Sequence, residues 1–91
     1  MSRIVVDPAP GETQLTLLGV RRWPVWEKGV STFPWEYFED ETSYIVAGHA
    51  IVTPEGGAAV EIGAGDLVRF ESGLICKWQI IEPIRKHYRF G

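Results

Sequence analysis

The segment Gly29–Gly48, which reads GVSTFPWEYFEDETSYIVAG, places glycine, aromatic and acidic residues at regular spacings. Five residues separate Gly29 from Trp35, one separates Trp35 from Tyr37, and three separate Tyr37 from Glu41. Six more residues lead from Glu41 to Gly48. These spacings are the strongest indication of the fold in this chain, and they mark the residues from which a site is predicted.

The spacings resemble the first sequence signature of the cupin family. That signature has histidines at the two positions that Trp35 and Tyr37 hold here, whereas its glutamate is retained as Glu41. The resemblance implies that these three side chains point into the cavity of a barrel. It also implies that two histidine ligands of the usual cupin metal site are missing.

The second cupin signature is matched over residues 65–80. Its glycines are retained at Gly65 and Gly73, but Glu71 replaces a proline, Cys76 a histidine and Ile80 an asparagine. The resemblance therefore places Cys76 in the cavity as well, and a third histidine ligand is missing.

More narrowly, the chain resembles the small single-domain cupins that share a domain with ureidoglycine aminohydrolase. Four features carry this resemblance: Trp23-Pro24-Val25-Trp26, Trp35-Glu36-Tyr37, Gly65-Asp66, and Glu82-Pro83-Ile84-Arg85-Lys86-His87-Tyr88. The resemblance selects an all-β, cupin-type double-stranded β-helix (a jelly-roll barrel) as the fold.

Composition limits the cellular setting and the partners. Ninety-one residues, of which 45% are hydrophobic, predict one domain with its own core over residues 1–91. The apolar runs are too short to span a bilayer, and no basic-then-apolar leader is recognised, so we expect a soluble, cytoplasmic protein. One cysteine fits a reducing compartment, and a net charge of −3 argues against nucleic-acid binding.

Short β-rich runs separated by turns predict the strands, and no run of ten residues has a helical period. Residues 1–20 are expected to form an N-terminal arm or edge strands, and residues 23–90 the barrel. Val25–Thr32 should break at Gly29, and Pro83 should mark a bend or a strand start. The further strands are expected at 42–47, 49–53, 58–62, 67–71, 76–82 and 86–90.

Strand alternation extends the inward set beyond the signature positions. From Glu41, Ser43 and Ile45 should point inward; from Cys76, Trp78 and Ile80 should do so. Val68 with Phe70 is the more apolar choice for the core in the preceding strand. Tyr44 and Val46 should face outward, which we interpret as a candidate homodimer surface.

The signature positions offer poor ligands for a metal. An indole N–H only donates, a phenol must first lose its proton, and a carboxylate with a thiol completes the set. His49 and His87 match no ligand position. We therefore predict no bound metal and no cofactor.

The predicted ligand-binding residues are those that line the cavity, with Lys86 at its rim: Trp35, Tyr37, Glu41, Cys76, Trp78 and Lys86. Glu41 and Tyr37 are candidate acid–base groups, because burial among aromatic rings disfavours a charged carboxylate. The alternatives are that the aromatic residues only fill the core, that Glu41 is structural, and that Cys76 is a small apolar residue. The basic run Arg85–Arg89 is either a solvated strand face or an anion contact.

Three functions follow from this pattern. The first is a barrel that binds a small polar or ring-bearing metabolite. The second is the one that the narrower resemblance implies, a metal-assisted enzyme that releases ammonia from a ureido compound. The third is a structural or interaction barrel filled by its own side chains.

Overall fold

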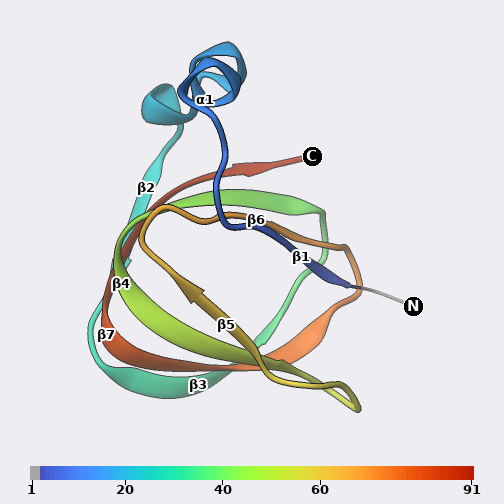
Figure 1. The fold of residues 1–91 in the computed structure, drawn as a ribbon. Coiled ribbons are helices and arrows are strands. Elements are labelled where there is room, and N and C mark those ends of the chain that lie inside the picture. The colour runs from blue at the N-terminus through green and yellow to red at the C-terminus, as the bar shows by residue number, and fades with distance from the viewer. Residues whose placement is uncertain (1–2) are drawn as a thin grey trace.

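The computed structural model describes residues 3–91 as a small antiparallel β-barrel (Figure 1). This confirms the predicted all-β jelly roll. The elements in chain order are β1 (Ile4–Asp7), α1 (Glu12–Leu18), the 3₁₀ turn η1 (Val20–Arg22), β2 (Val25–Lys28), β3 (Ser31–Glu36), β4 (Glu41–Pro54), β5 (Val60–Gly63), β6 (Leu67–Phe70) and β7 (Ile75–Phe90).

The two longest strands, β4 and β7, pair with each other along most of their length and bend around the barrel (Figure 1). The first half of β4 pairs with β6 and its second half with β5. The first half of β7 pairs with β3 and its second half with β2. Each long strand therefore belongs to both layers of the jelly roll, and β1 extends one layer beside β6.

The bend in the two long strands lies where Gly48 meets Pro83. The register between β4 and β7 shifts around this point, which is the pattern of a β-bulge. Gly48 has φ of 98°, and a Cβ there would overlap the carbonyl oxygen of Pro83. Pro83 lies within β7 at this irregularity, so the prediction of two separate strands at 76–82 and 86–90 was wrong.

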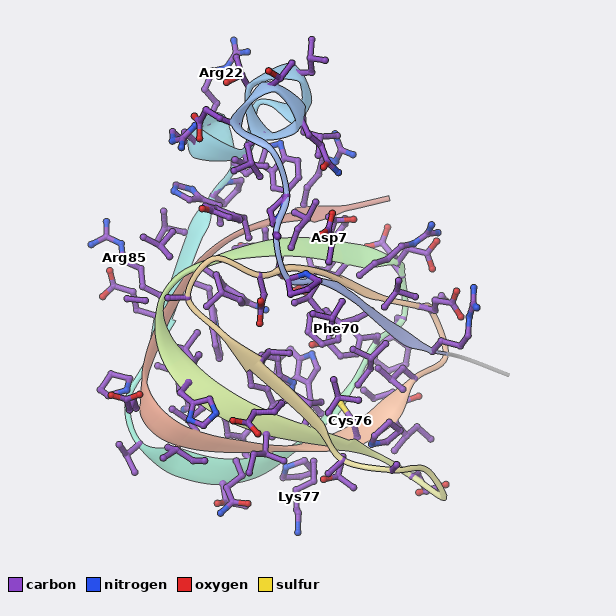
Figure 2. The ribbon with its side chains drawn as sticks, in the orientation of Figure 1. Asp7, Arg22, Phe70, Cys76, Lys77 and Arg85 are labelled. Atoms are coloured by element: carbon purple, nitrogen blue, oxygen red, sulfur yellow. The ribbon has the colours of Figure 1, made fainter. Side chains whose placement is uncertain are left out.

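The predicted alternation holds on each side of the bulge. Glu41, Ser43 and Ile45 are buried before it, whereas Ala50 and Val52 are buried after it, so the inward parity of β4 changes. Figure 2 shows the same alternation, with Phe70 and Cys76 inside the barrel and Lys77 and Arg85 projecting outward. The predicted break at Gly29 is confirmed, since β2 ends at Lys28 and β3 begins at Ser31.

The N-terminal region combines a strand with a helix. Ile4–Asp7 does form an edge strand, but the strand alternative for residues 15–18 was wrong, because they belong to α1. Leu15 of that helix packs with Val20 and Leu67 in a second, smaller core that also contacts Tyr44. Seven residues are too few for a periodic pattern to show. No helix within residues 3–91 is long and apolar enough to cross a membrane.

The same packing changes the interpretation of the outer surface. Tyr44 was expected to face a partner subunit, but it lies against the small core under α1 and is only partly exposed. Val46 remains exposed. The homodimer therefore stays a prediction, and its surface cannot be centred on Tyr44.

Candidate functional site

A cavity of about 210 Å³ opens into one end of the barrel between β2, β3, β4 and β7. Aromatic side chains dominate its wall. The lining residues are Trp26, Phe33, Trp35, Tyr37, Glu41, Trp78, Lys86, Tyr88 and Phe90.

A buried ion pair lies among these rings. The Nζ atom of Lys86 is 2.6 Å from Oε2 of Glu41, and the two side chains are 6% and 7% exposed. The hydroxyl of Ser43 donates a hydrogen bond of 2.7 Å to the same carboxylate oxygen. Two donors thus compensate the buried negative charge, which would otherwise be costly.

Aromatic rings surround the ammonium group of Lys86. Its Nζ atom lies 5.0 Å from the ring centre of Trp26, 5.1 Å from that of Trp78 and 5.4 Å from that of Phe70. The negative faces of such rings attract a cation within about 6 Å. The cage therefore supplies part of the stabilisation that water would give to an exposed lysine.

Strand register explains how the pair forms. Ile45 of β4 lies opposite Lys86 of β7, and Glu41 lies opposite Phe90. The two charged residues are therefore not direct cross-strand neighbours. The long side chain of Lys86 reaches back along β4 to Glu41, inside the barrel and between the sheets.

Burial shifts the pKa of two side chains that line the cavity, Lys86 and Tyr37. It lowers the pKa of Lys86, and the neighbouring Glu41 carboxylate opposes that effect. Burial is also the main reason that the pKa of Tyr37 is raised, with the Glu41 charge adding to it. Tyr37 is thus a neutral phenol, which makes it a hydrogen-bonding group and a poor base.

The rings of the wall pack on one another. Phe33 and Trp78 lie nearly parallel with centres 6.2 Å apart, and Trp26 meets both edge-on. Tyr37 stacks on Phe70 at 4.8 Å. This mutual packing holds the wall in place and leaves a rigid, largely apolar surface.

The structure brings together five of the six predicted ligand-binding residues: Trp35, Tyr37, Glu41, Trp78 and Lys86 line the cavity. The expectation that Lys86 lies at the rim was wrong, because it is buried against Glu41. Trp35 lies at the mouth instead, with 47% of its surface exposed.

Cys76 points into the barrel but is not among the cavity-lining residues. It packs in the main core, and Figure 2 shows its sulfur inside the ring of strands. Burial raises the pKa of its thiol to about 11. A thiol of that pKa is protonated at neutral pH, which favours the role of a core residue over that of a nucleophile.

Four lining residues were absent from the sequence prediction: Trp26, Phe33, Tyr88 and Phe90. In β7 the alternation from Cys76 and Trp78 predicts which residues point inward, and extending this alternation past Pro83 would have predicted Tyr88 and Phe90 as inward-facing. Phe33 lies opposite Trp78 in the pairing of β3 with β7. Trp26 lies in a strand without a signature residue, so its direction could not be derived by alternation.

The donors at the site do not suit a metal ion. Within residues 3–91 no group of three or more histidine, cysteine or acidic side chains is placed to hold one. Oε2 of Glu41 is already bonded to Lys86 and Ser43. His49 pairs with Glu61 at 2.6 Å, and His87 Nδ1 lies 3.0 Å from the carbonyl oxygen of Trp23. The prediction of no bound metal stays a prediction.

The basic run near the end of the chain does not form one charged face. Lys86 points inward, Arg89 stacks over Trp23 at 4.8 Å, and Arg85 lies 3.6 Å from Glu27. Adjacent residues of β7 thus point to different sides of the strand. This arrangement favours neither a single solvated face nor a concentrated anion contact.

The fold and the position of the signature residues inside it define a small cupin barrel. Residues 15–88 match the model of the EutQ-like cupin domain, and the chain belongs to this family. No curated protein sequence is significantly similar to it.

Solved structures of related proteins have the same fold. A DUF861 family protein from Thermotoga maritima is 44% identical with a TM-score of 0.95, over 98% of this chain and all of that one. The EutQ protein of Clostridium difficile is 23% identical with a TM-score of 0.66, over 72% of this chain and 52% of that one. The second likeness concerns the fold alone.

Proposed function

We propose that this protein binds a small metabolite with a flat, apolar ring and one polar group inside the barrel. The observation that supports this most directly is a buried ion pair, Lys86–Glu41, beside an open cavity whose other walls are aromatic. Rings provide stacking surface, and the pair fixes the orientation of a polar group. The cavity volume of about 210 Å³ is compatible with a single small ring system.

The polar end of the ligand would meet Lys86 and Glu41. An ammonium group has three donors, and Glu41 takes one of them. A carbonyl or hydroxyl oxygen of the ligand can accept from another donor without breaking the pair. A ligand that is uncharged at this end keeps the site electrically neutral, which avoids burying an extra charge.

Intrinsic tryptophan fluorescence tests this proposal, because Trp26, Trp35 and Trp78 line the cavity. A panel of single-ring compounds with one polar group is titrated, and melting temperature is measured in parallel. Binding should change the emission and raise the melting temperature.

Variants then locate the binding. Trp35→Ala should weaken it, because this residue forms the mouth and its removal leaves the main core intact. Phe38→Ala is the matched control, since Phe38 is an exposed aromatic residue outside the cavity lining. Equal affinities for the two variants would place the ligand elsewhere.

The narrower resemblance supplies a second candidate, ammonia release from ureidoglycine or a related ureido compound. The Lys86–Glu41 pair could orient such a planar amide, but the residues for the metal-assisted chemistry are not present at the signature positions. An ammonia assay with and without added manganese separates this activity from simple binding. Absence of any ligand response in either assay would favour a structural barrel.

A further inference from the structure

Lys86 differs from the other lysines of the chain in its surroundings. Lys28 and Lys77 are exposed, whereas Lys86 is 5% exposed and lines the cavity. Among the ion pairs of residues 3–91, Lys86–Glu41 is the one in which both side chains are buried. Desolvation in an apolar cavity is one way in which proteins make a lysine nucleophilic. The carboxylate of Glu41 favours the charged ammonium form, but it is also close enough to accept the proton of Lys86.

We propose that Lys86 is a carbonyl-reactive amine that forms an imine with a small, flat aldehyde held in the cavity. This inference rests on the ligand-binding role proposed above. It goes further, because it assigns a covalent step to one atom, Nζ of Lys86, and a chemical class to the ligand.

The geometry supplies a route for the protons. The ammonium group can pass a proton over 2.6 Å to Oε2 of Glu41, which leaves a neutral amine with a free lone pair. Burial favours this neutral state of the lysine. The hydroxyl of Ser43 donates to the same oxygen of Glu41 and holds the carboxyl group beside Lys86. A base and a nucleophile thus lie within hydrogen-bond reach of each other.

The reaction balances without any other reagent. The nitrogen lone pair attacks the carbonyl carbon, and the carbonyl oxygen takes the proton from Glu41 to give a carbinolamine. Glu41 then accepts a proton from nitrogen and returns it to the departing hydroxyl group, which leaves as water. The products are a protonated imine and water, the total charge is unchanged, and the carboxylate of Glu41 pairs with the iminium ion.

The wall of the cavity limits which carbonyl compounds can reach Lys86. The rings of Trp26 and Trp78 lie on the ammonium group, so a flat substituent on the carbonyl carbon can stack beside them. The largely aromatic wall favours a flat apolar substituent over a strongly hydrated one. Benzaldehyde is a probe of suitable size and shape, and benzyl alcohol is its matched compound without the carbonyl group.

The test is reductive trapping of the native protein. Benzaldehyde and cyanoborohydride are added at neutral pH, and the modified lysine is found by peptide mass spectrometry. Lys86 should be labelled several-fold faster than Lys28 and Lys77, although it is the least exposed of the three. In urea, where the cavity is lost, labelling should be equal at all three.

Because the labelled lysine is identified in the wild-type protein, this test does not depend on whether a variant folds. Lys86→Arg is added as a second measurement and should lose the fast label while keeping the slow labels. Labelling at Lys86 equal to or slower than that at Lys28 and Lys77 would overturn the proposal.

Benzyl alcohol separates this proposal from the binding role. If benzyl alcohol alters the tryptophan emission but benzaldehyde does not label Lys86, the covalent step is wrong and the binding role stands. If Lys86 is labelled but benzyl alcohol does not bind, the reactive amine stands and the general ring-binding role is wrong.

Discussion

Two ion pairs of almost equal length occupy opposite environments. Lys86 and Glu41 are 2.6 Å apart inside the barrel, and Arg69 and Asp40 are 2.7 Å apart on its surface. The side chains of the surface pair are 54% and 32% exposed, against 6% and 7% inside. Water can replace either partner at the surface, whereas in the interior no second charged group pairs with Glu41 or Lys86 in residues 3–91.

The comparison shows that the distance between two charged groups does not by itself determine how much their ion pair contributes to stability. A surface pair is screened by water and salt and contributes little. A buried pair is costly to desolvate as a whole, yet the loss of one partner leaves a charge in an apolar site. The interior pair therefore contributes little net stability but makes each of its members indispensable to the other.

The largest expected effect is that of removing one interior partner. Lys86→Met should lower the free energy of unfolding by about 3–5 kcal/mol, because Glu41 then stays buried without its cation. Urea denaturation measures this. Lys77→Met, an exposed lysine on the same strand, is the control and should change stability little.

The same experiment can be sharpened with a double variant. Lys86→Met with Glu41→Leu removes both charges, and most of the lost stability should return. If Lys86→Met is as stable as Lys77→Met, Glu41 has found another partner, and the interior pair contributes as little to stability as the surface pair.

An intermediate effect is expected from the thiol beside the cavity. Burial raises the pKa of Cys76 from 9.0 to about 11, so the folded chain keeps a proton that the unfolded chain releases. The stability that this group contributes is therefore present below pH 9.0 and is lost as pH rises through about 11. Cys76→Val should lose less stability than wild type over this range in urea titrations at successive pH values.

Tyr37 and Lys86 interact electrostatically with Cys76, so the difference between the two proteins includes this coupling as well as the titration of the thiol. Parallel stability profiles for wild type and Cys76→Val between pH 9 and 11 would contradict the buried position of the thiol.

The smallest effect is expected at the surface pair. Arg69→Gln should change stability only slightly, and even that difference should disappear in concentrated salt, because solvent screens exposed charges. The change from Lys86→Met should persist in the same salt. If Arg69→Gln lowers the free energy of unfolding by the same amount in concentrated salt, the Arg69–Asp40 pair is less accessible to water and ions than its exposed surface implies.

The sequence was sufficient for the barrel and for one wall of the cavity. The resemblance to the two cupin signatures implied the fold and the inward anchors Glu41 and Cys76. Alternation from these anchors correctly predicted that Ser43, Ile45, Trp78 and Ile80 are buried. The alternation succeeded because β-strand geometry has a period of two and does not depend on distant residues.

The depth of Lys86 and the helix α1 could not be predicted in the same way. A lysine in a basic run is ordinarily a surface residue, and its burial depends on Glu41, which lies 45 residues earlier in the chain. Helix α1 is too short for a period, and it is stabilised by contacts between Leu15, Val20 and Leu67 that form only in the folded protein. Both depend on contacts between segments that are far apart in sequence.

The position of β7 in the chain has a consequence for synthesis on the ribosome. Strands β2 and β3 pair with β7 and with no other strand of residues 3–91. Both are made long before β7, so their edges stay unpaired until residues 75–90 emerge. The barrel then has to close by contacts that are distant in sequence, which is slow, and its exposed strand edges invite association between nascent chains until it does.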